Sequence, residues 1–297
     1  RMAAKHGFEE SELESLFKNV RIRNDILKAI SKPAEGKPWF EYRSIFINDE
    51  RIRKGARFMN THAETLMMSR RASGVPEEMT TAILGVETGY GRRTGRFGVL
   101  DALVTLAFRY PPRSKLFRQE LEPFLLLSRE EDIRPNRIKG SYAGAMGIAQ
   151  FMPTSYRLYA VDFDGDGKRD LSKNMSDAIG SVANYFKVHG WRQREPIAMR
   201  ASVAGVENLD ALSFSLKSPR TLEQWVAMGV EPAQEYSDSQ TAALIQLKGS
   251  DGPEYWLAFH NFYVITRYNK STNYAMAVFQ LSREIESHRQ RTRADAP

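Results

Sequence analysis

The spacing of apolar residues changes once along this chain, and that change constrains the fold more than any other feature. Before Trp191 apolar residues recur every three or four positions, which is typical of helices, and Gly and Pro interrupt the pattern. After Trp191, short apolar runs predict strands at 197–203, 212–216, 242–247 and 255–259, with a helix at 221–228 between them. Helical spacing returns from 262 to 285, with a turn at 267–272. The sequence therefore predicts a mainly α (α+β) protein with a small α/β insert.

Local signals set the expected ends of several helices. Ser11 and Glu14 have the spacing of a capping box and predict a helix start there. One long helix is expected over 49–72, and further helices begin near 76, 100, 115 and 176. Pro123 removes a backbone donor and should kink or split its helix. The turn residues 249–252 precede the last strand, and the polar tail after Glu286 should be frayed.

Composition narrows the classes of function. The 297 residues suggest about two domains, and 42% hydrophobic residues are enough for a packed core. The chain has no Cys, which excludes disulfides, thiolate metal sites and a Cys nucleophile. Its longest apolar runs, such as 124–127, are far shorter than the ~20 residues of a membrane span, so no transmembrane segment is expected. The net charge of +7 fits a solvated basic surface or an anionic polymer as substrate, and no nucleic-acid-binding motif accompanies it.

A single carboxylate, Glu87, ends an apolar helical stretch and is followed by a Gly-rich run through Gly95 and Gly98. This composition predicts that the chain opens into a cleft at Glu87. Burial against apolar neighbours raises the pKa of a carboxyl group, which is what a general acid needs near neutral pH. The alternative is a surface Glu near a helix end that glycines cap.

The segment 140–153 combines small residues with groups suited to a sugar. Its Gly and Ala residues let the backbone approach a ligand closely. Ser141, Gln150, Phe151 and Met152 offer a hydroxyl, an amide and apolar faces, a mixture that commonly lines sugar-binding grooves. The alternative is close helix packing through Gly and Ala, with the amide at a helix end.

Four segments in this order, 82–92, 140–153, 178–186 and 261–269, resemble motifs of the lytic transglycosylase B family, glycoside hydrolase family 103. The likeness covers nearly the whole chain. It implies a lysozyme-like helical core that cleaves the β-1,4 bond between N-acetylmuramic acid and N-acetylglucosamine in peptidoglycan.

The resemblance also implies roles for individual residues. By its position in the motif, Glu87 corresponds to the family's single catalytic acid. The groove residues implied in the second motif are Ser141, Gln150 and Phe151, and further members are Tyr42, Tyr185, Tyr268, Asn269 and Tyr274. Each aromatic residue, taken alone, also fits an ordinary core position.

One carboxylate is sufficient for a non-hydrolytic reaction. Ordinary glycosidases place two carboxyl groups on either side of the bond, ~5 Å apart for retention or ~6.5 to 9.5 Å apart for inversion. Here a protonated Glu87 would donate to the leaving oxygen and then, as a carboxylate, take the proton of the muramyl C6 hydroxyl. That hydroxyl attacks C1 and closes a 1,6-anhydro ring without water. We expect the substrate's N-acetyl group and Asn269 to stabilise the transition state, while Tyr and Phe rings stack on the sugars.

The segment 162–168 matches the first half of an EF-hand calcium loop. Asp162, Asp164 and Asp166 occupy loop positions one, three and five. Gly167 allows the sharp turn at position six, and Lys168 offers its backbone carbonyl at position seven. Oxygen atoms at alternate positions suit a hard cation, so structural calcium is the expected cofactor and no organic cofactor is expected.

The second half of this loop departs from the usual pattern. Position twelve is Lys173, where an EF-hand has a bidentate Glu. The resemblance implies a lengthened loop closed by an acid of the following helix, Asp177, and Asp170 is the alternative ligand. A polar turn without metal also fits these residues. Bound calcium is expected to hold the loop behind the groove rather than to take part in catalysis.

The expected organisation has three parts. A helical domain comprises 1–75 and 275–297, a lysozyme-like catalytic core with the calcium loop comprises 76–192 and 256–274, and the α/β insert comprises 193–255.

The expected function is that of a lytic transglycosylase, and two alternatives stay open. One is a hydrolytic muramidase acting on the same bond, and the other is a non-catalytic peptidoglycan-binding protein. The expected location is the periplasm, with a lipid anchor to the outer membrane as one form. Peptidoglycan strands are the expected partner, other cell-wall enzymes are candidate partners, and nucleic acid is not expected to bind.

Overall fold

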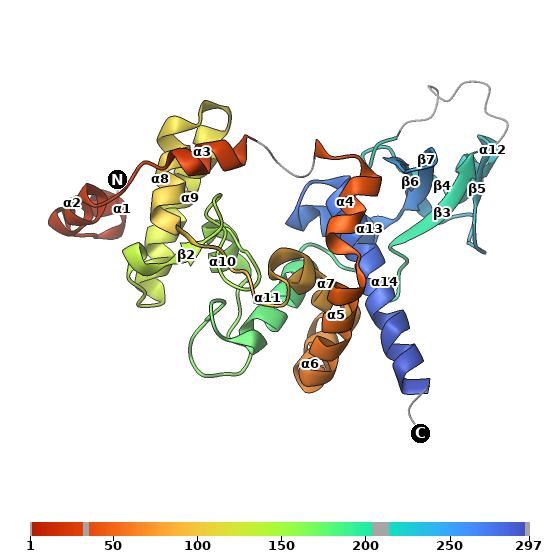
Figure 1. Ribbon diagram of the computed structural model, residues 1–297, viewed down its shortest axis with the longest axis horizontal. Coiled ribbons are helices and arrows are strands. Elements are labelled where there is room, and N and C mark those ends of the chain that lie inside the picture. The colour runs from red at the N-terminus through yellow and green to blue at the C-terminus, as the bar shows by residue number, and fades with distance from the viewer. Residues whose placement is uncertain (1, 32–35, 204–213, 295–297) are drawn as a thin grey trace. The chain divides into compact units, whose positions relative to one another are not determined.

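The computed structural model describes residues 2–31, 36–203 and 214–294. The chain divides into two compact units. Unit 1 comprises Arg1–Pro33 and Glu87–Tyr185, and unit 2 comprises Ala34–Val86 and Phe186–Pro297. Two helices each have residues in both units: α7 (Glu77–Thr88) and α11 (Met175–Val188), which are labelled in Figure 1.

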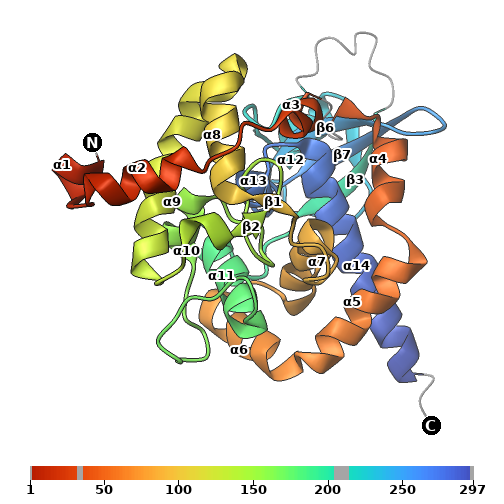
Figure 2. The ribbon, with the colours of Figure 1, turned by 60° about the vertical axis from the view of Figure 1, so that its left-hand side comes forward.

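Unit 1 is built almost entirely from helices. Besides the end of α7 and most of α11, its elements are α1 (Met2–His6), α2 (Glu10–Lys18), α3 (Asn24–Ile30), β1 (Phe97–Gly98), α8 (Val99–Arg109), the 3₁₀ helix Pro111–Arg113, α9 (Ser114–Glu130), the 3₁₀ helix Pro135–Arg137, β2 (Lys139–Gly140) and α10 (Pro153–Tyr159). Helix α8 lies against α9, α3 packs on α8, and α10 packs on α9 (Figure 2). Because α8 is buried along most of its length, it forms the centre of this unit.

Unit 2 combines helices with one small sheet. Besides most of α7 and the end of α11, its helices are α4 (Trp39–Phe46), α5 (Asp49–Thr61), α6 (Ala63–Ser73), α12 (Leu222–Ala227), α13 (His260–Tyr268) and α14 (Thr272–Ala294). Its strands are β3 (Ala198–Val203), β4 (Arg220–Thr221), β5 (Val230–Pro232), β6 (Thr241–Lys248) and β7 (Pro253–Ala258). Helix α14 packs against α4, α5 and α13.

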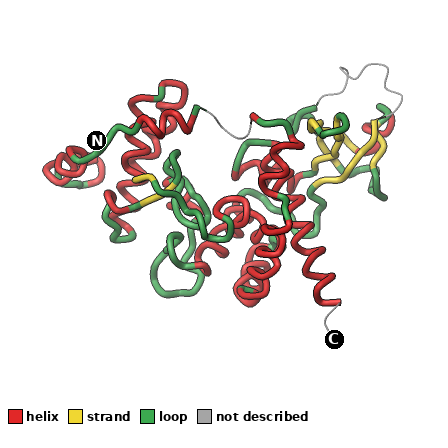
Figure 3. Tube along the Cα trace, in the orientation of Figure 1, coloured by secondary structure: helices red, strands yellow, loops and turns green. Residues whose placement is uncertain are grey.

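The sheet of unit 2 is antiparallel with the strand order β4-β6-β7-β3-β5, and Figure 3 shows it in yellow. Lys248 pairs with Pro253, so the predicted turn residues 249–252 join β6 to β7. One face of the sheet packs against α12 in an apolar cluster with Trp225 inside it. The indole nitrogen of Trp225 donates a hydrogen bond to the carbonyl of Ala242 at 2.8 Å, which satisfies this buried polar atom.

The predicted change of pattern after Trp191 is confirmed. The expected strands at 197–203, 242–247 and 255–259 correspond to β3, β6 and β7, and the expected helix at 221–228 corresponds to α12. The strand expected at 212–216 is wrong for residues 214–216, which form an irregular segment that enters a turn at 216, and residues 212–213 lie outside the described part of the chain. The division of the chain into three domains stays a prediction.

Three expectations about helices are wrong, and a fourth is wrong in part. The helix expected over 49–72 is two helices, because His62 leaves helical geometry at φ −112° and ψ 29° and caps both α5 and α6. Helix α2 starts at Glu10 without a side-chain cap, so Ser11 forms no capping box. Helix α9 runs through Pro123, so the expected split is wrong, and its packing against α8 and α10 outweighs one lost backbone bond. The expected kink at Pro123 stays a prediction. The tail after Glu286 continues α14 to Ala294.

Candidate active site

The end of α7 carries Glu87, which is partly exposed, and its neighbour Thr88 ties this helix end to the second motif. Thr88 is buried, and its hydroxyl donates to the carbonyl of Ile148 at 2.9 Å. The same hydroxyl oxygen accepts the backbone N–H of Gly91 at 2.9 Å. Thr88 thus fixes the helix end that carries Glu87 against segment 140–153. The only sign of this role in the sequence is that Thr88 follows Glu87.

The chain reverses direction directly after α7. Gly89, Tyr90 and Gly91 have φ values of 59°, 64° and 82°, the left-handed region that favours glycine. Further on, a Cβ atom added to Gly95 would lie 2.0 Å from the carbonyl of Gly140, so only glycine allows these two backbones to pass so closely. The Gly-rich run after Glu87 therefore meets segment 140–153 side by side, and strands β1 and β2 pair there.

Ser141 organises the first turn of segment 140–153. Its hydroxyl oxygen accepts the backbone N–H groups of Ala143 at 3.2 Å and Ala145 at 3.0 Å. Its own backbone N–H donates to the carbonyl of Ala145 at 2.8 Å. Because the oxygen of Ser141 accepts these two bonds, the hydroxyl hydrogen is the part of the side chain that remains to donate to a ligand.

Gln150 has a strained backbone and a side chain with two hydrogen bonds. Its φ is 51°, which is uncommon for a residue other than glycine. Its amide nitrogen donates to the carbonyls of Thr94 at 3.0 Å and Gly147 at 2.8 Å. Both hydrogens of the amide are used inside the protein, so the amide oxygen is the atom suited to contact a substrate hydroxyl.

Phe151 and Tyr185 form part of the aromatic interior of unit 1. Phe151 is 2% exposed and Tyr185 is 7% exposed, and their ring centroids are 5.6 Å apart. Tyr185 also contacts Tyr159 edge to face, with 4.9 Å between the centroids. These two predicted groove residues are therefore packed as core residues, and their contact with a sugar stays a prediction.

The other predicted groove residues belong to unit 2. Tyr42 on α4 and Tyr274 on α14 are 2% and 3% exposed. Tyr268 ends α13, and Asn269 follows it with partial exposure. The side-chain oxygen of Asn269 accepts the N–H of Ser271 at 3.1 Å, and the hydroxyl of Ser271 accepts the N–H of Tyr274 at 3.2 Å. One turn between α13 and α14 thus brings three of these residues together, while Tyr42 lies on a different helix.

A further residue of unit 1, Glu120 on α9, supports the segment that holds Gln150. Glu120 is 7% exposed, and its carboxylate accepts the backbone N–H of Thr154 at 2.8 Å. Thr154 lies in the first turn of α10, directly after the second motif. Burial raises the pKa of the Glu120 carboxyl group above its usual value. The helix α9 carries several charged residues, so nothing in the sequence marks Glu120 as the one that makes this contact.

Three of the predicted metal ligands form an acidic cluster in unit 1. Asp162, Asp164 and Asp177 each place a carboxylate oxygen within 4.8 Å of the others. Ca²⁺ binds oxygen at about 2.3–2.6 Å, so two ligands on opposite sides of one ion lie up to about 5 Å apart. The cluster therefore fits a single calcium ion in both its chemistry and its spacing. Burial, and then the charges of Asp164 and Asp162, raise the pKa of Asp177.

Asp177 is fully buried at the start of α11, and its carboxylate binds backbone groups of the loop. Its two oxygens accept the backbone N–H groups of Phe163 and Asp170, both at 2.8 Å. Asp170 instead turns its carboxylate to the N–H groups of residues 172 and 173, at 2.8 and 3.1 Å. Asp166 lies outside the three-residue cluster and accepts the N–H of Lys168 at 2.9 Å. These contacts favour Asp177 over Asp170 as the acid that closes the loop.

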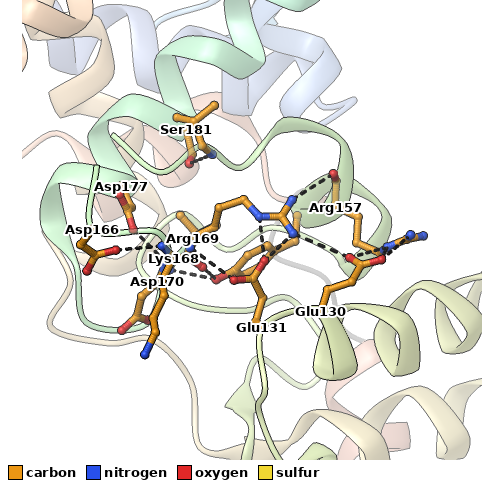
Figure 4. Close-up of polar contacts among 12 residues, drawn as sticks. Glu130, Glu131, Arg157, Asp166, Lys168, Arg169, Asp170, Asp177 and Ser181 are labelled. Carbon is orange, nitrogen blue, oxygen red and sulfur yellow. Dashed lines mark hydrogen bonds and ion pairs between the residues drawn. The ribbon is translucent and has the colours of Figure 1, made fainter. Parts of the chain in front are cut away.

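Ion pairs fasten the same loop to the end of α9 and join α9 to α10, as Figure 4 shows. Arg169 donates to Glu131 at 2.7 Å. Arg157 binds Glu130 through two nitrogens, with a shortest distance of 2.7 Å, and this hydrogen bond lowers the pKa of Glu130. The sequence predicts the ligands of the loop but not these partners, because the pairs join residues that are far apart in the chain.

Comparison with known proteins decides the family. The family model described as "Transglycosylase SLT domain" matches residues 1–283. The chain belongs to this transglycosylase family. Over 295 residues it is 41% identical to the membrane-bound lytic murein transglycosylase B of Escherichia coli strain K12, covering 96% of this chain and 80% of that protein.

Two solved transglycosylase structures are similar over nearly all of the chain. The soluble lytic transglycosylase SltB1 of Pseudomonas aeruginosa is 48% identical with a TM-score of 0.90, covering 97% of each chain. A lytic transglycosylase of E. coli in complex with calcium is 41% identical with a TM-score of 0.89, covering 97% of this chain and 91% of that one.

The predicted resemblance, the mainly α lysozyme-like fold class and the enzyme class are confirmed. The function is that of a peptidoglycan lytic transglycosylase, and neither the hydrolytic nor the non-catalytic alternative is favoured. Within the described residues, no helix combines the length and the apolar character that crossing a membrane requires.

Proposed function

We propose that this lytic transglycosylase cleaves its substrate with Glu87 as the only catalytic carboxylate. The observation that carries this proposal is the link between Thr88 and Ile148, because it joins the end of α7 to the loop of Ser141 and Gln150. A fixed geometry between an acid and the groups that hold a substrate supplies much of the rate of an enzyme. The hydrogen bond of Thr88, the residue next to Glu87, supports such a geometry in this chain.

Glu87 acts first as an acid and then as a base. In its protonated form it donates to the oxygen of the β-1,4 bond between N-acetylmuramic acid and N-acetylglucosamine, and that bond to C1 breaks. The resulting carboxylate accepts the proton of the muramyl C6 hydroxyl, whose oxygen bonds to C1. The product is a 1,6-anhydromuramic acid end, and Glu87 regains its proton, so no water is consumed.

Ser141 and Gln150 hold the glycan with complementary atoms. The hydroxyl of Ser141 donates, and the amide oxygen of Gln150 accepts, because their other hydrogen-bonding atoms are already engaged within the loop. Phe151, which belongs to this segment, packs against Tyr185, and this buried pair supports the segment. For Asn269, Tyr268, Tyr274 and Tyr42 we propose contacts with the glycan as well, with Asn269 stabilising the positive charge that develops on the sugar.

Calcium is the structural cofactor of the loop 162–173. Asp162, Asp164 and Asp177 supply the carboxylates, and Asp166 and the carbonyl of Lys168 add ligands as loop positions five and seven. When bound, calcium supplies positive charge that offsets the repulsion among these acids, and it has no part in bond cleavage. The calcium complex of the related E. coli enzyme supports this assignment.

The proposed organisation keeps three parts: a catalytic core of 76–192 and 256–274, a helical domain of 1–75 and 275–297, and an insert of 193–255 that contains most of the sheet. We place the enzyme in the periplasm, because the similar E. coli protein is a membrane-bound murein transglycosylase. A lipid anchor to the outer membrane and contacts with other cell-wall enzymes belong to the same proposal.

The substitution Glu87→Gln tests the proposed role. Gln keeps the shape of the side chain but can neither donate an acidic proton nor accept one, so turnover should fall by at least about 10²-fold, the lower end for loss of general acid–base catalysis. Mass spectrometry of digested peptidoglycan measures anhydromuropeptides, and a thermal melt serves as the folding control. Turnover close to that of the wild type would remove Glu87 from the role, and products with reducing ends would contradict the non-hydrolytic reaction.

A further inference from the structure

Unit 2 contains a cavity of about 520 Å³ that the proposed reaction does not use. Residues of β3, β7, α4 and α14 line it. Its volume lies within the ~300–1,000 Å³ of small-ligand sites. Arg200 and Trp256 line this cavity, whereas Leu257, the neighbour of Trp256, belongs to the apolar cluster with α12, so the cavity lies mainly on the opposite sheet face. Met199 belongs to the apolar cluster and also contributes to the lining.

The ring of Trp256 lines the cavity, and the side chain of Arg200 covers one face of this ring. Arg200 and Trp256 are direct partners across β3 and β7, and the guanidinium lies 5.2 Å from the ring centroid. Arg200 also binds Glu254 at 2.7 Å, and Phe279 contacts Trp256 edge to face. Because Trp256 is only 9% exposed and carries Arg200 on its face, it has no open surface for stacking a sugar. The charge of Glu254 is neutralised by the same arginine.

Other charged groups on the wall remain available to a ligand. Arg43 donates from its Nε to Gln280 at 3.0 Å, which orients its guanidinium and leaves the two terminal nitrogens. Among the described residues, Arg283 and Glu284 have no ion-pair partner. The cavity therefore offers two guanidinium groups and one carboxylate. A guanidinium binds a carboxylate through two parallel hydrogen bonds, whereas Glu284 is suited to an ammonium group.

We propose that this cavity binds a short peptide that carries free carboxylates and an amino group. Such a peptide matches both kinds of charge on the wall, whereas an uncharged glycan matches neither. The identification of this ligand with the peptide stems of peptidoglycan rests on the proposed function. A second contact on the same polymer would raise the local concentration of glycan at the enzyme, because the two contacts share one molecule.

Isothermal titration calorimetry on the full chain tests the site. The probe is the synthetic tripeptide L-Ala-γ-D-Glu-diaminopimelic acid, and the comparison is the same peptide with every carboxyl group amidated. The amidated peptide should bind at least about tenfold more weakly, since each lost charge-assisted bond is worth over ~1.4 kcal/mol. The double substitution Arg43→Gln with Arg283→Gln should have the same effect. The matched control is Arg57→Gln on α5, an exposed arginine that does not line the cavity, and it should not change the affinity.

Besides a failure of the tripeptide to bind at all, three results would overturn the inference. They are equal affinity for both peptides, unchanged affinity in the double variant, and displacement of the tripeptide by a pentamer of N-acetylglucosamine. If the double variant has a lowered melting temperature, the comparison of the free and amidated peptides on the wild type still tests the site, because it leaves the protein unchanged. Turnover of peptide-free glycan strands by the wild type is measured alongside. Intact turnover without peptide binding refutes the cavity alone, whereas absent turnover refutes the proposed function whatever the calorimetry shows.

Discussion

The closing ligand of the acidic loop can be identified by the effect of calcium on thermal stability. A ligand that binds only the folded state stabilises it by about 2.7 kcal/mol at a hundredfold excess over its dissociation constant. For a domain of about 150–250 residues, 1 kcal/mol shifts the melting temperature by about 2–4 °C. Saturating calcium should therefore raise the melting temperature of the wild type by about 5–11 °C, and a chelator should remove this rise with little loss of rate at a permissive temperature.

Two substitutions, Asp177→Asn and Asp170→Asn, separate the candidate ligands. Asp177 lies within 4.8 Å of Asp162 and Asp164, so losing its charge should remove most of the calcium-dependent rise. The carboxylate of Asp170 accepts hydrogen bonds from two backbone N–H groups, which the side-chain oxygen of asparagine can also accept. The Asp170→Asn variant should therefore keep the calcium-dependent rise in melting temperature. The quantity compared is the rise in each variant rather than the absolute melting temperature, because Asp177 also binds two backbone groups without metal.

Differential scanning fluorimetry with a calcium titration, repeated with magnesium, measures these values. A wild type whose melting temperature ignores calcium would refute the metal site. A rise that survives in Asp177→Asn and disappears in Asp170→Asn would instead make Asp170 the closing ligand and contradict the inference from the hydrogen bonds.

Two further predictions concern the frame around Gln150. Gly147→Ala places a Cβ atom 2.4 Å from the carbonyl oxygen of Leu171 at a φ of 70°, so thermal melts should show a loss of more than ~2 kcal/mol, whereas Gly7→Ala, with φ 63° and open space, should cost only about 1–2 kcal/mol. Glu120→Ala leaves the N–H of Thr154 without its acceptor and should cost about 1–3 kcal/mol, whereas Glu120→Gln keeps an acceptor. Because burial raises the pKa of Glu120, the wild type gains stability as the pH falls through that pKa. Thermal melts from pH 7 downward should therefore show that any stability advantage of the Gln variant at neutral pH becomes smaller. An advantage that grows as the pH falls would contradict the effect of burial on this pKa.

Local patterns in the sequence were sufficient to predict most elements of the fold. Helices α8 and α11 and strands β6 and β7 each follow from the spacing of apolar residues within one segment. The break at His62 could not be predicted this way, because apolar residues keep their helical spacing on both sides of it. Where a helix bends depends on what it packs against, and α5 packs against α14, which lies far away in the sequence.

The candidate site was predictable only where its chemistry lies in adjacent residues. The acidic positions of the loop follow from one short segment, but the choice of Asp177 over Asp170 needs the hydrogen bonds that the folded loop makes. The same holds for Thr88 and Glu120, whose partners are 60 and 34 positions away. Contacts of this kind produce no periodic pattern in the sequence, because each joins a single side chain to a single backbone group.

The groups that hold the segment 140–153 support the proposed mechanism with a single carboxylate. Ser141 and Gln150 bind backbone atoms of their own segment and of Thr94, and Thr88 binds the backbone of Ile148. These bonds leave few internal rotations open to the loop next to Glu87. An enzyme with two carboxylates can divide charge stabilisation and proton transfer between them, whereas one with a single carboxylate must move a proton twice through the same group. In the proposed mechanism, the hydrogen-bonded backbone keeps both proton transfers within reach of Glu87 without a second acid.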